Sequence, residues 1–166
     1  MAKSAATITL ITSSALAAGI GAASANPGAV GTTTVALDAT LRDCDFTTVR
    51  NPPLEQAPAL GTGQVRIHTT GSTAVAEVFL SDSPDPGTQF TVGIIEEPRP
   101  SSANCGPGAP GTSYTSMVTD AAGTGTVTVK DNLRPGTTGV WVMIERPNPH
   151  AQDPAEYYTT EFVVPA

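Results

Sequence analysis

Apolar and polar residues alternate with a period of two in a series of short segments along most of this chain. In the segment 89–95, for example, Phe90, Val92 and Ile94 share one phase, and Thr91 lies between two of them. A period of two places successive side chains on opposite faces of a β-strand, so each segment is predicted to be a strand with a buried face. The predicted strands are 33–41, 64–69, 73–80, 89–95, 114–119, 124–129, 140–145 and 157–164, while 44–49 either continues the first strand or pairs locally.

Glycine, proline and aspartate separate these segments. The stretches 70–72 (Thr-Gly-Ser) and 120–123 (Asp-Ala-Ala-Gly) have the length and composition of hairpin turns. Prolines break the remaining connections, because proline has no backbone N–H to donate to a sheet. The predicted proline-containing loops are 51–61, 96–111 and 147–154.

An all-β fold is what this pattern predicts. About seven to nine short strands without an amphipathic helix fold most naturally as two packed antiparallel sheets, an immunoglobulin-like sandwich, and a small closed barrel is the alternative. The segment 140–145 is apolar at both phases, so both of its faces are expected to be covered. The predicted core consists of Val35, Leu37, Val65, Ile67, Val75, Phe79, Phe90, Val92, Ile94, Val127, Val129, Val140, Val142, Ile144 and Phe162.

The first residues of the chain follow a different pattern. Lys3 precedes an apolar stretch within 8–20, and Ala23-Ser24-Ala25 supplies the small residues of a cleavage site. A transmembrane anchor is the alternative, but threonine and serine interrupt the apolar stretch and leave it too short and too polar to span a bilayer. The sequence therefore predicts a signal peptide at 1–25, followed by a single β-sandwich domain at 26–166 with no membrane span.

Cys44 and Cys105 are the two cysteines of the chain. Cysteines of an exported protein pair in the oxidising environment that they reach. Neither residue belongs to a Cys-x-x-Cys motif or has a histidine nearby, which argues against a redox or metal pair. One structural disulfide between Cys44 and Cys105 is predicted.

The formal net charge is −7, and the few basic residues are scattered along the chain. Proteins that bind nucleic acid or anionic lipid concentrate lysine and arginine on one surface, so these two partner classes are not expected. An acidic excess is typical of a protein that remains soluble outside the cell.

The leader, Cys44, the stretch 90–95 (FTVGII), Cys105 and the stretch 119–125 (TDAAGTG) together resemble small secreted actinobacterial proteins of the mycobacterial type, whose function is unknown. The resemblance spans most of 26–166. It implies an exported β-sandwich, and it transfers no catalytic residue to this chain.

Few residues are candidates for catalysis. His68 is predicted on a solvated strand face beside Arg66, whereas His150 lies in a loop near Asp153 and Glu156, where a hydrolase site could form. The chain lacks the Gly-x-Ser-x-Gly motif of a serine nucleophile, and two histidines are too few for the ligands of a copper–zinc dismutase. No catalytic residue and no cofactor are therefore assigned.

Paired carboxylates offer two further possibilities. Glu96 and Glu97 directly follow the predicted strand 89–95, and adjacent residues in an extended strand point to opposite faces, so these two carboxylates are not expected to share a substrate. Asp82 and Asp85 lie in one loop and could bind calcium together with backbone carbonyl groups, although aspartate in a turn also has an ordinary structural role. They are the candidate metal ligands.

Threonines on the outer strand faces could accept a sugar or another ligand if an exposed aromatic patch lay beside them. Trp141 with Tyr157 or Tyr158 is the predicted patch. The function expected from the sequence is a secreted or cell-envelope-associated, non-enzymatic domain that binds a protein or glycan partner. The alternative is an extracellular hydrolase that uses His150 with nearby carboxylates.

Overall fold

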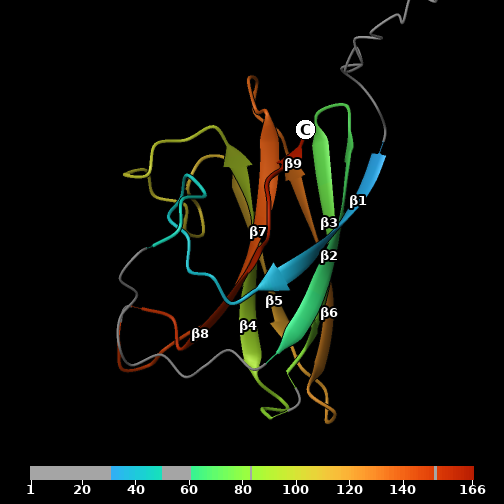
Figure 1. The fold of residues 1–166 in the computed structure, drawn as a ribbon, viewed down its shortest axis with the longest axis vertical. Helices are drawn as coiled ribbons and strands as arrows, with labels where there is room; N and C mark the ends of the chain where they lie inside the picture. The colour runs from blue at the N-terminus through green and yellow to red at the C-terminus, as the bar shows by residue number, and fades with distance from the viewer. Residues whose placement is uncertain (1–30, 50–60, 83, 152) are drawn as a thin grey trace, which may run out of the picture.

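The computed structural model describes residues 31–49, 61–82, 84–151 and 153–166, and these residues form an all-β domain (Figure 1). The predicted signal peptide at 1–25 lies outside the described residues. Across the described ranges, no helix is both long and apolar enough to span a bilayer. The strands are β1 (Gly31–Asp38), β2 (Thr62–Thr70), β3 (Thr73–Ser81), β4 (Gln89–Glu97), β5 (Thr112–Val118), β6 (Thr124–Asn132), β7 (Gly139–Arg146), β8 (Glu156–Thr160) and β9 (Val164–Pro165).

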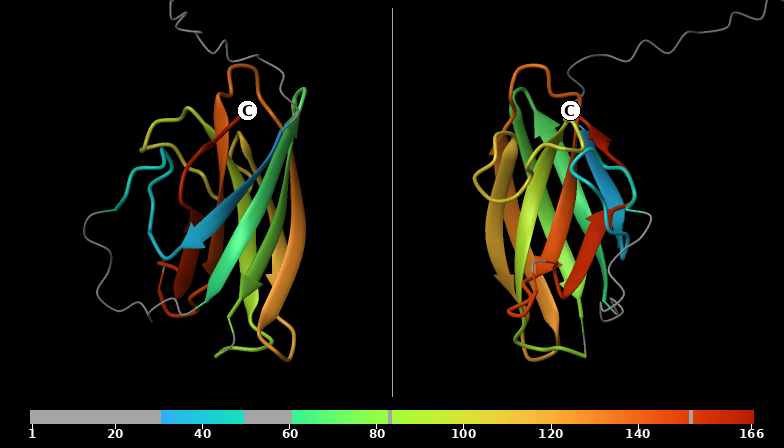
Figure 2. Two further views of the ribbon diagram at one scale, coloured as in Figure 1. Left: turned by 45° about the vertical axis from the view of Figure 1, so that its right-hand side comes forward. Right: turned by 90° about the vertical axis from the view of Figure 1, so that its left-hand side faces the viewer.

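The strands form one antiparallel sheet in the order β5-β4-β7-β8-β1-β2-β3-β6, and β9 pairs with β7. The sheet folds over on itself, so that β4 and β7 lie opposite β2 and β3 (Figure 2). Its two edge strands nearly meet, because the Ser113 hydroxyl on β5 donates a hydrogen bond to the backbone oxygen of Lys130 on β6, at 2.6 Å. The predicted all-β antiparallel fold is confirmed, and the nearly closed sheet combines the sandwich with the barrel alternative.

Two turns that look alike in sequence connect strands in different ways. The turn at Gly71 joins the paired strands β2 and β3, as predicted, and Gly71 adopts the positive φ of 59° that such a turn requires. The turn 120–123 was wrongly predicted to join two paired strands. It crosses instead from one sheet edge to the other, since β5 pairs with β4 and β6 pairs with β3.

Two other segments that were predicted as strands have a different structure. The segment after β1 does not continue that strand; it pairs with itself through a bridge between Arg42 and Thr48. The predicted strand 157–164 is interrupted, because β8 ends at Thr160 and β9 begins at Val164. Phe162 lies in this interruption and is 45% exposed, so its assignment to the core was wrong.

The core lies between the two halves of the folded sheet. The predicted phases of β2, β4 and β7 are confirmed, but that of β3 is wrong by one residue: Val78 and Leu80 point inward, while Phe79 points outward and Val75 is only partly buried. Leu37 and Val127 are partly buried against this core. The buried members of the core are Val35, Val65, Ile67, Ala74, Ala76, Val78, Leu80, Phe90, Val92, Ile94, Met117, Val129, Val140, Val142, Ile144, Tyr158 and Val164.

A second, smaller apolar cluster covers the other face of β4 and β7. Ile95, Trp141 and Met143 point to this side, and the segments that carry Cys44 and Cys105 lie over them. The predicted disulfide between these cysteines is confirmed, with a Cα–Cα distance of 5.6 Å. Every residue from Gly139 to Ile144 is consequently buried, as the apolar pattern of this strand predicted. On the opposite side of the domain, no segment of the described residues covers the outer face of β1, β2, β3 and β6 (Figure 2).

Candidate functional site

The aromatic patch predicted from Trp141, Tyr157 and Tyr158 is not formed, and this prediction is corrected. Trp141 is fully buried, with its ring packed edge-on against Phe46 at 5.4 Å between centroids, and its indole N–H donates to Glu97 Oε1 at 3.0 Å. Tyr158 is also buried, in the main core, and Tyr157 is only partly exposed. Trp141 is buried because the disulfide holds Phe46 and its neighbours across β7. The alternation of residues within β7 does not reveal this cover.

An exposed aromatic ring does lie beside threonines, on the outer face of β1, β2, β3 and β6, which we call the open face. Antiparallel pairing places Gln64 of β2, Phe79 of β3 and Thr126 of β6 directly beside one another. Directly paired residues of neighbouring strands point to the same face of a sheet. The next row along the strands is made of Arg66, Glu77 and Thr128, and it is followed by His68, Val75 and Lys130.

The first two rows line a shallow hollow of about 410 Å³. Phe79 is 40% exposed there, and Arg66 Nη1 lies 3.0 Å from Glu77 Oε2 beside it. The hollow therefore presents one apolar ring, a side-chain amide, two threonine hydroxyls and an exposed ion pair. These groups together suit a ligand that has both apolar surface and several hydroxyl groups.

Phe79 is the residue of this face that the sequence analysis missed. Its phase in β3 was assigned to the core because phenylalanine is usually buried. A signal for the opposite phase was present, since Glu77 shares the phase of Phe79, whereas Ala74, Ala76, Val78 and Leu80 form a wholly apolar alternative.

The residues of the hydrolase alternative are not joined into one network. His150 is exposed, and its backbone N–H donates to Asn148 Oδ1 at 2.9 Å. Within the described ranges, its imidazole ring forms no hydrogen bond or ion pair. Asp153 is also exposed, whereas Glu156 is buried and interacts with Arg146 and with the hydroxyl of Tyr158.

Asp82 and Asp85 are the candidate metal ligands, and a third carboxylate, that of Glu156, lies close to them. The sequence had placed Glu156 near His150. One oxygen each of Asp82, Asp85 and Glu156 lie within 4.8 Å of one another. Arg146 forms ion pairs with two of these carboxylates: its Nη1 lies 3.0 Å from Asp85 Oδ2, and its Nε lies 3.2 Å from Glu156 Oε2. The hydroxyl of Tyr158 donates to Glu156 Oε1. We call these three carboxylates the acidic cluster.

The acidic cluster contains an oxygen that is unsatisfied. Asp82 is 1% exposed, and its Oδ2 has no hydrogen-bond partner among the described residues. Burial raises the pKa of the Asp82 carboxyl, and the nearby negative charge of Asp85 raises this pKa further. Burial likewise raises the pKa of Glu156. Buried carboxylates are normally bonded or neutralised, so this cluster is a candidate for a bound cation.

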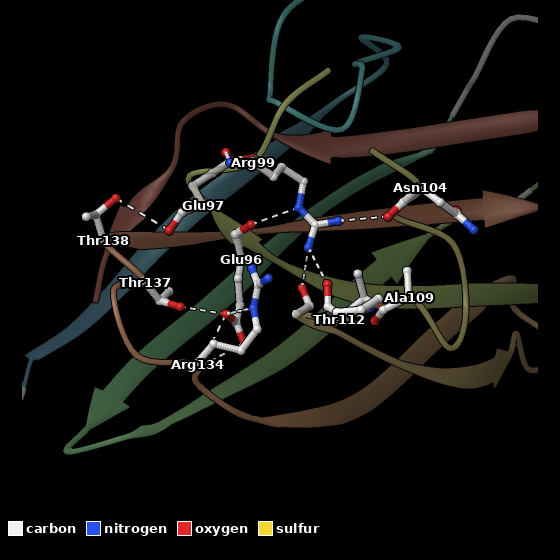
Figure 3. Close-up of polar contacts among 11 residues, drawn as sticks. Glu96, Glu97, Arg99, Asn104, Ala109, Thr112, Arg134, Thr137 and Thr138 are labelled. Atoms are coloured by element: carbon white, nitrogen blue, oxygen red, sulfur yellow. Dashed lines mark hydrogen bonds and ion pairs between the residues drawn. The ribbon is translucent and has the colours of Figure 1, made fainter. Parts of the chain in front are cut away.

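A second buried carboxylate, Glu96, lies near the end of β4, whereas the acidic cluster lies before its start, and Figure 3 shows the polar contacts of Glu96. Its Oε2 is 2.8 Å from Arg134 Nε and accepts a hydrogen bond from the Thr137 hydroxyl at 2.5 Å. Arg99 donates to the backbone oxygen of Glu96 at 3.0 Å and to three carbonyl groups of the loop 98–111. Glu97 points the other way, toward Trp141, so the two glutamates face opposite sides as predicted. Arg134 and Thr137 satisfy the buried carboxylate of Glu96, and we assign it a structural role.

Asp131 on β6 lies beside Glu96, and the pKa values of the two carboxyl groups move in opposite directions. Burial raises the pKa of Asp131, and the negative charge of Glu96 raises it further. Burial also opposes the ionised form of Glu96, but hydrogen bonds from Thr137 and Arg134 outweigh burial and hold its pKa below the usual value. Glu96 therefore keeps its charge, and Asp131 is the residue whose ionisation costs stability.

The replacement Asp131→Asn is expected to raise the free energy of unfolding at pH 7, because it removes a carboxyl group whose ionisation the folded state opposes. Because folding raises the pKa of Asp131, the stabilising contribution of its proton is complete below the ordinary aspartate pKa and is lost as the pH rises through the raised value. Asparagine avoids that loss, so the gain is expected above this window and not below it. Urea unfolding at a series of pH values measures the difference, with the exposed Glu161→Gln as control. A gain that persists at low pH would contradict this explanation.

In comparisons with known proteins, no family model, no curated protein and no solved structure matches the chain.

Proposed function

We propose that this protein is exported, loses residues 1–25, and acts in the medium or the cell envelope as a non-enzymatic domain that binds a glycan through the open face. Two features support export: the leader pattern around Ala23-Ser24-Ala25, and a disulfide between Cys44 and Cys105, a bond that persists in oxidising compartments. The sequence resemblance to secreted actinobacterial proteins agrees with this proposal and stays a prediction.

The observation that carries the binding proposal is the position of Phe79. Most large apolar side chains of the described residues are buried, yet this ring is 40% exposed on a sheet face that no described segment covers. It lies between Gln64 and Thr126, which are its direct neighbours on β2 and β6. An exposed ring on a rigid sheet offers binding surface at a low cost in conformational entropy.

The composition of the open face favours a glycan over a protein partner. The core of a protein–protein interface is depleted of charged groups and contains several apolar residues. Here a single ring is surrounded by an amide, threonine hydroxyls and the Arg66–Glu77 ion pair. A sugar ring has an apolar C–H face that can lie on Phe79 and hydroxyl groups that can bond to the polar neighbours.

The test compares two phenylalanines of similar exposure. Phe79→Ala is expected to weaken binding to a cell-wall polysaccharide or to a positive of a glycan array by at least about tenfold, because it removes the stacking surface. Phe162→Ala is the matched control, since Phe162 is 45% exposed but lies between β8 and β9 and does not line the hollow around Phe79. The protein is recovered from the culture medium. Mass spectrometry first checks that residues 1–25 have been removed and that the two cysteines have formed a disulfide.

The possible results separate the parts of the proposal. Equal binding by Phe79→Ala and wild type would overturn the assignment of the open face, and equal losses in both variants would do the same. If the protein binds no glycan but binds a protein partner, and Phe79→Ala abolishes that binding, the assignment of the open face would stand and the assignment of a glycan ligand would be overturned. Intact Met1 with free thiols in the mature protein would overturn export.

A further inference from the structure

We propose that Asp82, Asp85 and Glu156 bind one calcium ion at the end of the domain where the β3–β4 and β5–β6 loops lie. This end is the lower one in Figure 1, and it is distinct from the open face. The proposal does not depend on the glycan function, because none of the three carboxylates lines the hollow around Phe79.

The spacing of the three oxygens fits calcium. Three atoms that lie within 4.8 Å of one another have a common centre no more than about 2.8 Å from each of them. Calcium binds oxygen at about 2.3–2.6 Å, so a contraction of a few tenths of an ångström completes the contacts. Magnesium requires about 2.0–2.1 Å in a nearly ideal octahedron, which from the same upper limit is a larger contraction.

The charge of the acidic cluster also fits a divalent cation. Its three carboxylates and the guanidinium of Arg146 leave two formal negative charges when all are ionised. Arg146 contacts Asp85 and Glu156 through one oxygen of each, Oδ2 and Oε2, and it does not contact Asp82. The guanidinium therefore orients two of the ligands, and it acts on the third, Asp82, only through its charge and without an ion-pair contact.

Asp82 is the observation that points to a ligand instead of a solvated acidic surface. It is 1% exposed, and its Oδ2 has no hydrogen-bond partner within the described part of the chain. Its backbone N–H donates to the oxygen of Gly123 at 2.7 Å, which fixes the start of the loop. A buried carboxylate oxygen without a partner is costly, and coordination to a cation removes that cost.

The ion would connect segments that are far apart in the sequence. Asp82 and Asp85 belong to the β3–β4 loop, and Glu156 begins β8. Thr119, at the end of β5, already holds this loop by donating from its hydroxyl to the backbone oxygen of Asp85 at 3.2 Å. Calcium is thus expected to stabilise the folded state, because it binds a site that the unfolded chain does not form.

The experiment titrates calcium chloride into the full protein after treatment with EDTA, using isothermal calorimetry and thermal unfolding. We expect saturable binding of one ion, and a Tm that rises by at least about 5 °C when calcium is at a hundredfold excess over Kd. Magnesium chloride at the same concentrations is expected to bind at least about tenfold more weakly.

Two variants assign the site. Asp85→Asn should weaken calcium binding by at least about tenfold while preserving the fold, because the Asp85 side chain is half exposed and asparagine keeps its shape. Asp120→Asn is the matched control, with the same change of charge in the neighbouring β5–β6 loop at the same end of the domain. Asp82→Asn is the second ligand variant.

The results that would overturn the proposal are specific. They are an absence of calcium-dependent heat and of any change in Tm, unchanged affinity in Asp85→Asn, or an equal loss in Asp120→Asn. Equal affinity for magnesium would overturn the assignment to calcium. Failure of glycan binding with intact calcium binding would concern the open face alone.

Discussion

The replacement of both Cys44 and Cys105 by serine is expected to lower the free energy of unfolding by about 4 kcal/mol. The bond closes a loop with a sequence separation of 61, and opening it returns conformational freedom mainly to the unfolded chain. Unfolding in guanidinium chloride measures the loss, with the fluorescence of Trp141 as the signal, because it is the single tryptophan of the chain.

The same replacement should also change the environment of Trp141 before the domain unfolds. The disulfide holds Phe46 and its neighbours against the indole ring, and without the bond this cover can open locally. Emission at longer wavelength and faster quenching by a soluble quencher are therefore expected in the folded variant. Wild type in a reducing agent is the control, and it should lose a similar amount of stability. A loss below about 1 kcal/mol in both would show that the sheet restrains these segments without the bond.

The strands were predictable because each depends on local alternation. In β4 and β2 the inward phase carries Phe90, Val92, Val65 and Ile67, and the structure buries all four. The alternation becomes ambiguous where both phases are apolar. In β3 a single charged residue distinguishes the two phases, because the phase of Leu80 is wholly apolar, whereas the phase of Phe79 contains the charged Glu77 and faces the solvent.

The closure of the sheet was less predictable, because it depends on pairing between distant strands. The turn 120–123 has the chemistry of a tight turn in either topology: Asp120 Oδ1 accepts hydrogen bonds from the N–H groups of Ala122 and Thr124. What differs is the partner of each flanking strand, since β5 pairs with β4 and β6 pairs with β3, and the facing edges of β5 and β6 approach each other without forming a ladder. A local sequence signal does not contain that information.

The candidate sites were partly predictable for the same reason. Asp82 and Asp85 were found because they lie close together in one loop, whereas Glu156 and Arg146 reach them only through the pairing of β7 with β8. Trp141 was wrongly predicted to be exposed, because its surroundings include residues on both sides of the disulfide, far from β7 in the sequence. In each case the missing information was a long-range contact.

The replacement Trp141→Ala is expected to lower the free energy of unfolding by about 3–5 kcal/mol. The side chain is fully buried between β7 and the segments joined by the disulfide, so alanine leaves a large cavity and leaves Glu97 Oε1 without the indole donor. Far-ultraviolet circular dichroism in guanidinium chloride measures the loss, since the variant has no tryptophan to report it.

Phe162→Ala is the matched comparison for Trp141→Ala, because it removes an aromatic ring that is already 45% exposed, and it should cost less than about 1 kcal/mol. Trp141→Phe separates packing from hydrogen bonding: it keeps most of the apolar contact but loses the bond to Glu97, so an intermediate loss of about 1–3 kcal/mol is expected.

If Trp141→Ala cost no more than Phe162→Ala, the indole would be accessible and the segments around Cys44 and Cys105 would not cover β7. Trp141 would then again be a candidate for ligand contact, in place of Phe79 on the open face. A large loss of stability in Trp141→Ala, combined with unchanged glycan binding by the fraction that stays folded, is the result that the buried ring requires.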